Sequence, residues 1–297
     1  MNIKEIKKLK VGDILENIDI RKYTTYKVGG IAKLLIKPDN VKSLIKLLKY
    51  IKINNIKHKI LGNGSNLIFT DDLYDGILIK LDKLNNLKIK DMNVEVGAGY
   101  NLIKLSLETA RLGLTGLEFA SGIPGTIGGA IYMNAGAYNS DMGYIVKNVL
   151  VLTPDLEIKE MTNKEMNFHY RTSFLQKNPG YICLKVELML KKGKKEAILE
   201  VIRERKIRRL ETQPLEFPSA GSVFRNPKDD YAGRLIEEIG YKGYKIGGAQ
   251  VSEKHANFIV NKDRATGSDV KNLILEIKNK VKEKYDIELK VEQEFVD

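Results

Sequence analysis

The run Phe119-Ala-Ser-Gly-Ile-Pro-Gly-Thr-Ile-Gly-Gly-Ala-Ile-Tyr-Met-Asn-Ala-Gly-Ala-Tyr138 holds five glycines, at positions 122, 125, 128, 129 and 136. With Pro124, this density indicates a backbone that another group approaches closely. The interleaved Ile123, Ile127 and Ile131 indicate that the segment is buried. A planar, partly apolar cofactor with a pyrophosphate fits these demands. Close packing of a strand against a helix would need the same glycines, so the run alone leaves both interpretations open.

A second glycine loop lies in Lys59-Ile-Leu-Gly-Asn-Gly-Ser-Asn-Leu-Ile-Phe-Thr-Asp-Asp72. Gly62 and Gly64 can take positive φ, so that consecutive N–H groups converge on a phosphate with help from Ser65 and Asn66. The loop is not a dinucleotide fingerprint, because the third glycine and the following helix are missing. It is not a Walker loop, because no Gly-Lys-Ser/Thr closes it. A phosphate-binding turn between two strands remains, beside the alternative of an ordinary tight hairpin.

The run Pro218-Ser-Ala-Gly-Ser-Val-Phe-Arg-Asn-Pro227 suggests a binding site around Ser222. Two small residues precede the serine, so a bulky ligand can come close to the backbone. Phe224 offers an apolar wall, Arg225 a permanent positive charge and Asn226 an amide, which suits a polar anionic substrate. A turn that enters a strand is the alternative interpretation of the run.

Composition bounds the class of protein. A chain of 297 residues favours two or three domains with room for a flavin-sized ligand. The single cysteine, Cys183, and the absence of an apolar N-terminal or membrane-length run favour a cytoplasmic protein. The formal net charge is +12, but the lysines alternate with apolar residues along expected helices and no nucleic-acid-binding motif accompanies them. We therefore expect a protein that binds anionic metabolites, and neither nucleic acid nor membranes. A monomer is also expected, although the charge pattern does not bear on the oligomeric state.

Hydrophobic periodicity predicts alternating strands and helices. Strands are expected at 31–36, 56–61, 76–81, 94–96, 146–153, 181–190 and 256–261, and helices at 41–51, 102–112, 195–209, 232–239 and 270–281. Asp39 or Asn40 is expected to cap the first of these helices, and Ser268 the last. The prolines at 214 and 218 are the best candidate for a domain boundary.

Several runs, taken in order along nearly the whole chain, resemble one family. They are Gly62-Asn-Gly-Ser-Asn66, Gly122-Ile-Pro-Gly-Thr-Ile-Gly-Gly-Ala-Ile-Tyr-Met-Asn-Ala-Gly136, Tyr170-Arg-Thr-Ser173, Gln213-Pro-Leu-Glu-Phe-Pro-Ser-Ala-Gly-Ser-Val-Phe-Arg-Asn-Pro227 and Gly248-Ala-Gln-Val-Ser-Glu-Lys-His-Ala256. The resemblance is to UDP-N-acetylenolpyruvoylglucosamine reductase, the FAD enzyme of peptidoglycan precursor synthesis. The compact C-terminal part resembles the shorter type of this family, without the inserted tyrosine loop.

The resemblance implies an α+β (mixed α/β) fold. A two-part FAD-binding domain of the vanillyl-alcohol-oxidase-like type would precede a smaller α+β substrate domain. The implied divisions are 1–81, joined by the tail 288–297, for the first FAD-binding subdomain, 82–209 for the second, and 210–287 for the substrate domain.

The resemblance also implies a reaction. NADPH would reduce the flavin, and a hydride would then pass to C3 of the enolpyruvyl group of UDP-N-acetylglucosamine enolpyruvate, giving UDP-N-acetylmuramate after protonation at C2. Ser222 would donate that proton. Arg171 and Glu292 would stabilise the developing enolate, and a guanidinium suits that task because it stays charged.

Glu292 is chosen among three acids of the tail, which also contains Glu288 and Glu294. Alignment on the run Ile287-Glu-Leu favours Glu292. The chain departs from the family at Glu294, where a basic residue is usual. A solvated edge strand is the alternative interpretation of these acids.

The implied ligand-binding residues fall in the quoted runs. Those for FAD are Gly62, Asn63, Gly64, Ser65, Asn66, Ser121, Gly122, Ile123, Gly125, Thr126 and Gly128; those for substrate are Tyr170, Arg225, Asn226 and His255. No metal site is expected, because the three histidines are scattered. Another flavin oxidase of the same fold, acting on an alcohol, is the alternative function. No His or Cys beside the phosphate loop offers a covalent flavin anchor for it.

Overall fold

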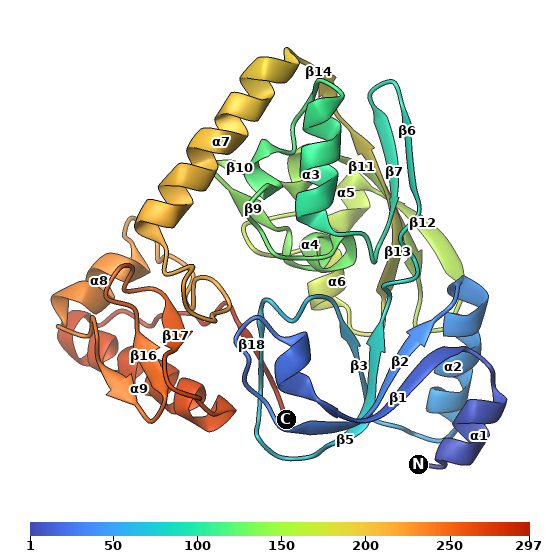
Figure 1. The fold of residues 1–297 in the computed structure, drawn as a ribbon, viewed down its shortest axis with the longest axis horizontal. Helices are drawn as coiled ribbons and strands as arrows, with labels where there is room; N and C mark the ends of the chain where they lie inside the picture. The colour runs from blue at the N-terminus through green and yellow to red at the C-terminus, as the bar shows by residue number, and fades with distance from the viewer. The chain divides into compact units, whose positions relative to one another are not determined.

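The computed structural model describes every residue, 1–297. The chain forms two compact units, each built from three separate segments. Unit 1 comprises Met1–Glu16, Leu34–Asn63 and Gly76–Lys206, and unit 2 comprises Asn17–Lys33, Gly64–Asp75 and Ile207–Asp297. Figure 1 labels the helices and strands along the chain.

The first sheet of unit 1 has the strand order β1-β2-β5-β3. These strands are β1 (Gly12–Asp19), β2 (Ile31–Pro38), β5 (Tyr74–Lys80) and β3 (His58–Leu61); one end of β1, of β2 and of β5 belongs to unit 2. β3 and β5 run parallel, with Leu61 paired to Lys80 at their ends. Because β3 stops there, Gly62 begins the first glycine loop at the edge of this sheet.

Two helices belong to this part of unit 1, α1 (Ile3–Lys8) and α2 (Val41–Ile53). The side chain of Asn40 accepts a hydrogen bond from Ser43 N at 3.0 Å, so Asn40 is the N-cap of α2. Residues three and four apart on one face of α2 are buried, namely Leu44, Leu47, Leu48 and Ile51. This apolar stripe is the reason that the segment is a core-facing helix.

The second sheet of unit 1 has the order β12-β11-β13-β7-β6. All its pairings are antiparallel, between β12 (Ile158–Thr162), β11 (Val146–Leu152), β13 (Ile182–Met189), β7 (Asn93–Gly97) and β6 (Leu87–Lys90). Helix α4 (Ile127–Met133) contacts β13 and β7. One apolar core joins both sheets of unit 1, and it includes Leu34, Ile79, Val96, Ile127 and Val186.

Short elements connect these layers of unit 1. They are α3 (Leu102–Arg111), β8 (Leu114–Thr115), η2 (Glu118–Ala120), β9 (Gly136–Ala137), β10 (Ser140–Asp141), η3 (Met142–Tyr144), α5 (Asn163–Met166), α6 (Phe174–Lys177) and β14 (Lys191–Lys192). Helix α7 (Lys195–Thr212) is polar on most of its surface and buries only Ile198 and Ile202. Figure 1 shows α7 as a long helix that follows β14.

Unit 2 has its own core, which includes Tyr26, Ile68, Phe224, Leu273 and Ile277. Around it lie η1 (Ile20–Tyr23), α8 (Ala232–Glu238), α9 (Gly267–Tyr285) and a small sheet of β15 (Lys245–Ile246), β16 (Ala249–Val251) and β17 (Ile259–Asn261). The last strand, β18 (Glu294–Val296), pairs in parallel with β4 (Leu67–Phe69). This pairing brings the C-terminal tail beside the chain that leaves the first glycine loop.

Most predicted elements appear near their expected bounds, with a few corrections. The strand expected at 256–261 is only β17 (Ile259–Asn261), and the helix expected at 195–209 continues to Thr212. The short strands β4 and β18 and helix α4 are absent from the sequence-based prediction. The three-domain division stays a prediction.

The expected cap of the last helix is wrong. Helix α9 begins at Gly267, and Thr266 is its N-cap, with its side chain accepting a hydrogen bond from Asp269 N at 3.0 Å. Asp269 in turn accepts from Thr266 N at 2.9 Å, which completes a capping box. Ser268 lies inside the first turn, where its hydroxyl contacts Asp71.

We expect Thr266→Ala to lower the free energy of unfolding by about 1 kcal/mol, because the amide groups at the start of α9 lose their partner. Ser268→Ala is the matched control and should stay within ~0.5 kcal/mol of wild type. Denaturant unfolding followed by circular dichroism measures both. A larger loss for Ser268→Ala would contradict this assignment of the cap.

Candidate cofactor and substrate site

The first glycine loop starts in unit 1, at Gly62. Lys80 Nζ donates a hydrogen bond to the Gly62 carbonyl oxygen at 2.5 Å. A Cβ added to Gly62 would lie 2.9 Å from Thr126 Oγ1, which is too close for a real side chain. Thr126 is the N-cap of α4 and belongs to the second glycine loop. The two loops that the sequence singles out therefore touch within unit 1.

The second loop contains glycines of two kinds. Gly128 donates its N–H to Ala98 O at 2.8 Å, and its Cβ would lie 3.1 Å from Ala98 Cβ, so close packing explains this glycine. Gly125 is different, because its φ is not in the left-handed region and a Cβ there would have no protein atom within 4 Å. Protein packing therefore does not require glycine at 125, and the space beside it is open.

The rest of the second loop is held by its own backbone. Ser121 Oγ donates to Glu118 O at 2.9 Å, and Gly125 N donates to Ile123 O at 2.8 Å. Gly125 O accepts from Leu102 N at 3.0 Å, at the start of α3. Gly122 and Ile123 are partly exposed beside these bonds.

The first loop continues in unit 2, where Gly64 has φ +61°. A Cβ at this position would overlap the Tyr23 carbonyl oxygen, so glycine is required twice over. Positive φ is confirmed for Gly64, but the expectation is wrong for Gly62. Thr25 N donates to Gly64 O at 3.3 Å, and the buried Thr25 Oγ1 has no hydrogen-bond partner. Ser65 and Asn66 follow, both partly exposed.

Arg171 occupies a tight turn in unit 1. His169 and Thr172 exchange two backbone hydrogen bonds of 3.0 Å, and Tyr170 and Arg171 form the tip between them. Arg171 has φ +54°, which costs a non-glycine residue about 1 kcal/mol. Its guanidinium carbon lies 5.0 Å from the centre of the Tyr170 ring. Such a backbone persists only where neighbouring groups hold it.

The neighbour that holds this turn is Asn134, at the C-terminal end of α4. Asn134 is 1% exposed, and its Nδ2 donates to His169 O at 2.8 Å. Its Oδ1 accepts from Gly143 N at 3.0 Å, and its own φ of +43° ends the helix. Ser173, next to the turn, donates to Tyr132 O at 2.8 Å. Helix α4 thus carries the second glycine loop at one end and supports Arg171 at the other.

The serine run lies in unit 2 and is held by two buried amide side chains. Asn257 accepts from Phe224 N at 3.0 Å and donates to Phe224 O at 2.8 Å. Gln293 donates to Ala220 O at 3.0 Å and accepts from Tyr26 Oη at 3.3 Å. The backbone on both sides of Ser222 is therefore constrained.

The Ser222 side chain itself is partly exposed. The backbone of Ser222 forms an isolated β-bridge with Phe258. The next residue, Val223, donates its N–H to Asn257 O at 2.9 Å. No hydrogen bond within the protein engages the Ser222 hydroxyl. The backbone of Ser222 is anchored, and its hydroxyl can still donate and accept hydrogen bonds. Such a hydroxyl is suited to binding a ligand.

Glu292 lies on the chain segment next to Ser222. Glu292 N donates to Val223 O at 2.8 Å, and Asn66 Nδ2 donates to Glu292 O at 3.1 Å. Asn66 O accepts from Glu294 N at 2.9 Å. The structure therefore brings Asn66, Ser222 and Glu292 together within unit 2.

The three tail acids differ in exposure. Glu288 is exposed, with 72% of its side chain accessible, while Glu292 and Glu294 are partly buried. Glu294 belongs to β18, a strand of a two-stranded sheet, and the alternative of an edge strand stays open for it. Its backbone pairs with Leu67 of β4.

The residues after Ser222 serve partly structural purposes. Phe224 is 1% exposed and lies in the core of unit 2, so it is not the apolar wall of a site. Arg225 N donates to Lys290 O at 2.9 Å, next to the tail. Asn226 Oδ1 accepts from Ala232 N at 3.2 Å, at the start of α8.

His255 is a half-buried histidine of unit 2. Burial, more than any neighbouring group, lowers its pKa below the usual value. Its Nδ1 accepts a hydrogen bond from Asn257 N at 3.2 Å, so the ring proton is on Nε2. His255 contacts the same asparagine that anchors the serine run, and it can act as a hydrogen-bond donor.

Sequence reasoning assigned no role to Lys80, Asn134, Asn257 or Gln293. Each is a buried polar residue whose partner lies far along the chain or on backbone. Asn134 and Gln293 sit within or beside quoted runs, but a single sequence does not show that they are buried. No group of three or more His, Cys, Asp or Glu side chains could hold a metal ion.

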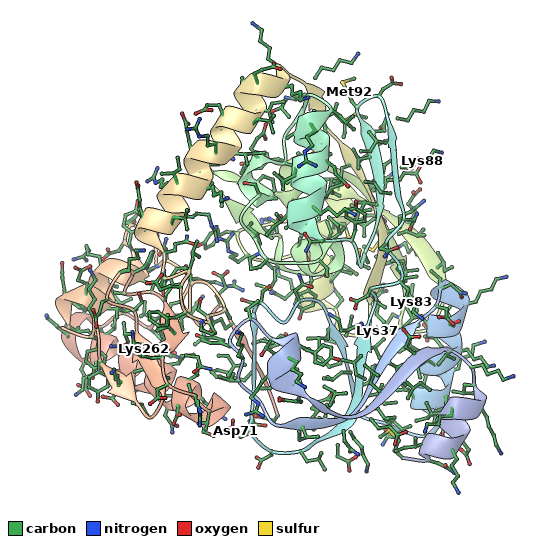
Figure 2. All side chains as sticks on the ribbon, in the orientation of Figure 1. Lys37, Asp71, Lys83, Lys88, Met92 and Lys262 are labelled. Atoms are coloured by element: carbon green, nitrogen blue, oxygen red, sulfur yellow. The ribbon has the colours of Figure 1, made fainter.

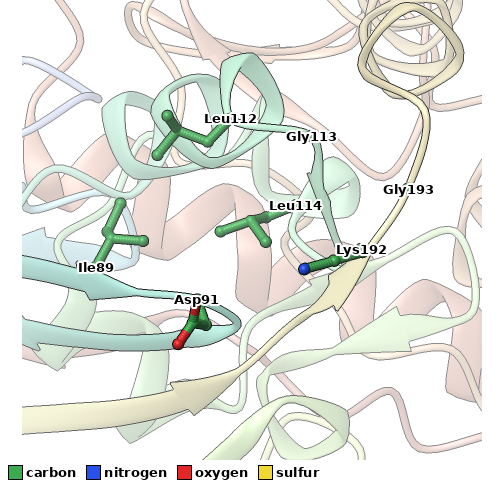
Figure 3. Close-up of a pocket in the computed structure, with 7 residues that line it drawn as sticks. All are labelled: Ile89, Asp91, Leu112, Gly113, Leu114, Lys192 and Gly193. Atoms are coloured by element: carbon green, nitrogen blue, oxygen red, sulfur yellow. The ribbon is translucent and has the colours of Figure 1, made fainter.

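A pocket of about 410 Å³ opens elsewhere in unit 1, as Figure 3 shows. The apolar side chains of Ile89, Leu112 and Leu114 line it, with Asp91 and Lys192. It contains none of the site residues predicted from the sequence.

Comparisons with known proteins agree on one family. Residues 32–162 match the family described as FAD binding domain, and residues 213–296 match the C-terminal domain of UDP-N-acetylenolpyruvoylglucosamine reductase. The reductase of that name from Anoxybacillus flavithermus is 47% identical over 98% of this chain and 97% of its own. The one from Bacillus licheniformis is 46% identical over 99% and 97%.

The same similarity appears in three dimensions. The crystal structure of UDP-N-acetylenolpyruvylglucosamine reductase from Thermus caldophilus superposes with a TM-score of 0.80 at 36% identity, covering 96% of this chain and 98% of that one. The predicted mixed α/β fold with an FAD-binding domain is therefore confirmed. No helix has the length and apolar character needed to span a bilayer.

FAD suits the residues that the two loops present. The open space beside Gly125 admits a group that the protein itself does not supply. The buried Thr25 Oγ1, next to Gly64, offers a hydrogen bond that no protein group takes. Gly62, Gly125 and Thr126 all lie inside the segment that matches the FAD-binding family.

We expect Gly125→Val to lower the FAD content of the purified protein, because its side chain fills space that the protein leaves open. The melting temperature of the FAD-free chain should stay close to wild type, since an added Cβ meets no protein atom within 4 Å. Absorbance and protein concentration give the FAD content, and thermal unfolding gives the stability. Stoichiometric FAD in a folded Gly125→Val protein would contradict the assignment of this loop. Gly64→Val is a poorer test, because it would also overlap the Tyr23 carbonyl.

Proposed function

Because the chain belongs to the UDP-N-acetylenolpyruvoylglucosamine reductase family, we propose that it reduces UDP-N-acetylglucosamine enolpyruvate to UDP-N-acetylmuramate with NADPH as electron donor. The observation that carries the proposal furthest is the cluster of Asn66, Ser222 and Glu292 in unit 2. Ser222, the proposed proton donor, and the acid Glu292 lie there on two chain segments that are joined by a backbone hydrogen bond. FAD, when bound, would accept electrons from NADPH and deliver a hydride to the substrate.

The proposed role of Ser222 is to donate a proton to C2 of the substrate. A serine hydroxyl is a weak acid in water. The substrate carbanion or enolate, however, is a far stronger base than the serine alkoxide that remains after proton transfer. The constraints on its backbone from Asn257 and Gln293 support a defined position for this hydroxyl. A positioned weak acid suffices when the acceptor is a strong base.

Arg171 and Glu292 are proposed to stabilise negative charge that develops at the substrate carboxyl group. Arg171 does so with a permanent positive charge, and the turn held by Asn134 limits its freedom. Glu292 contributes only as a neutral carboxyl that donates a hydrogen bond, because an ionised carboxylate would repel the developing charge. Tyr170, Arg225, Asn226 and His255 are the proposed contacts to the rest of the substrate.

The accompanying proposals concern partners and location. We expect a cytoplasmic monomer that binds neither nucleic acid nor membranes. Many lysines pair with acids close to them, such as Lys83 with Asp13 and Asp39, and Lys185 with Glu95, which supports an ordinary solvated surface. Figure 2 shows Lys83 and Lys88 at the surface of unit 1. The alternative, an alcohol-oxidising flavin enzyme, is not favoured because the similar proteins over the full length are reductases by name.

The function is tested by the flavin absorbance of the purified protein and of Ser222→Ala. In wild type, the bands should bleach with NADPH and recover when the enolpyruvyl substrate is added. In Ser222→Ala, bleaching should be nearly unchanged, while turnover falls on the order of 10³-fold because the proton donor is gone. Rapid-mixing absorbance follows both steps. Normal turnover of the variant would make Ser222 structural, and no recovery in wild type would refute the function.

The three tail acids give a second test. Glu292→Gln keeps the shape of the side chain but removes its acidic proton, so we expect at least tenfold lower turnover with little change in stability. Glu288→Gln and Glu294→Gln are the matched controls and should retain most activity, each within about 0.5 kcal/mol of wild type in stability. Steady-state kinetics and thermal melts compare them. An inactive Glu294→Gln with an active Glu292→Gln would show that the tail is aligned two residues out of register.

A further inference from the structure

Lys80 is a buried lysine that the proposed reaction does not use. It is the last residue of β5, and only 8% of its side chain is exposed. Its ammonium group donates to Gly62 O at 2.5 Å and lies 3.4 Å from Asp82 Oδ1. Lysine is almost never buried unless it is paired, because removing its charge from water is costly. A buried ammonium group at a loop implicated in cofactor binding therefore needs an explanation.

The contact with Gly62 determines how the loop presents its backbone. In a trans peptide the C=O and the following N–H point in opposite directions. Lys80 holds the Gly62 carbonyl on its own side, so the N–H of Asn63 is presented on the other side. Thr126 lies close to Gly62 as well and limits rotation of this peptide. An outward-facing N–H at the start of a glycine loop is an anion-binding feature.

The charge of Lys80 is only partly neutralised within the protein. Asp82 is shared with a second lysine, Lys37, whose Nζ lies 3.0 Å from Asp82 Oδ2. Two ammonium groups thus surround one carboxylate, which leaves a net positive charge. Desolvation by burial is the main cause that lowers the pKa of Lys80, and an anion nearby would favour its charged form.

We propose that Lys80 is a positioning residue for FAD: it holds the Gly62–Asn63 peptide in the orientation that receives the diphosphate and supplies positive charge beneath it. The inference rests on the proposed use of FAD. It extends the cofactor site from the glycine loops to a side chain on the neighbouring strand. Lys80 lies inside the segment that matches the FAD-binding family.

A lysine that only stabilised the end of β5 would affect FAD affinity and stability in a different way. Replacing a buried charge by an apolar side chain of similar size is often neutral or stabilising. Lys80→Met should therefore keep or raise the melting temperature of the FAD-free chain, while its dissociation constant for FAD rises at least tenfold. A purely structural lysine would move the two quantities together, through loss of stability.

Lys37→Met is the matched control, because it removes the other lysine on Asp82 and leaves the contact with Gly62 in place. Figure 2 labels Lys37 on unit 1. Its dissociation constant for FAD should change less than threefold. The measurement is FAD released from the full-length holoenzyme on dilution, detected by flavin fluorescence, together with thermal unfolding of the FAD-free chain.

Three results would overturn the inference: wild-type FAD affinity in Lys80→Met, equal losses in Lys80→Met and Lys37→Met, or a loss of affinity matched by a loss of stability. If Lys80→Met does not fold, Lys80→Gln is measured, which keeps a donor but removes the charge. A tenfold weaker FAD affinity supports the role of the charge, and unchanged affinity overturns it. Wild type that binds no FAD would instead refute the proposed function, so the two failures are distinguishable.

Discussion

The pairing of β18 with β4 is the interaction on which unit 2 depends. Three segments build this unit, and the short ones, Asn17–Lys33 and Gly64–Asp75, are too small to bury a core by themselves. Parallel pairing of Glu294 with Leu67, and of Val296 with Phe69, joins the end of the chain to one of them. Asn261 Nδ2 donates to Tyr26 O at 3.0 Å and joins the other. Asp71 accepts from Gly267 N at 2.9 Å and ties the start of α9 to the same assembly.

This long-range closure has a chemical consequence. The residue that pairs the tail with the loop, Asn66, accepts from Glu294 N and donates to Glu292 O. Glu292 also donates its N–H to the carbonyl of Val223, the residue after Ser222. A shift of β18 by two residues would put Glu294 where Glu292 now lies, because residues two apart along an extended segment share a face. The register of one short strand therefore decides which acid accompanies the serine, and the buried Gln293 between Glu292 and Glu294 resists such a shift through its bonds to Ala220 and Tyr26.

Sequence patterns predicted the parts of the fold that rest on local rules. The periodic apolar residues of α2 and α9 depend on neighbours within a few positions, and these predictions hold. The cap of α2 was expected at Asp39 or Asn40, and the structure has Asn40. The cap of α9 was misplaced although Thr266 and Asp269 have the spacing of a capping box, whereas Lys271 stands three residues after Ser268. Positive φ was predicted for both Gly62 and Gly64. Which of the two glycines has positive φ depends on Tyr23 and Thr126, which lie elsewhere in the chain. Phe224 was taken for a site residue because burial is not visible in a run of ten residues.

The buried polar residues explain why the remaining site features escaped prediction. Asn134, Asn257 and Gln293 each satisfy backbone groups beside a predicted site residue, and a buried amide is acceptable only when both its donor and acceptor have partners. Their partners are fixed by tertiary structure, so composition and spacing contain no sign of them. Lys80 belongs to the same class but carries a charge as well, and its burial raises the free energy of the cofactor-free protein relative to one with an apolar side chain there. A binding site that keeps such a group accepts lower stability without its ligand, and the ligand's own negative charge is what offsets the burial. Within unit 1, the open space beside Gly125 and the incompletely neutralised Lys80 are both features that a bound anionic ligand would explain.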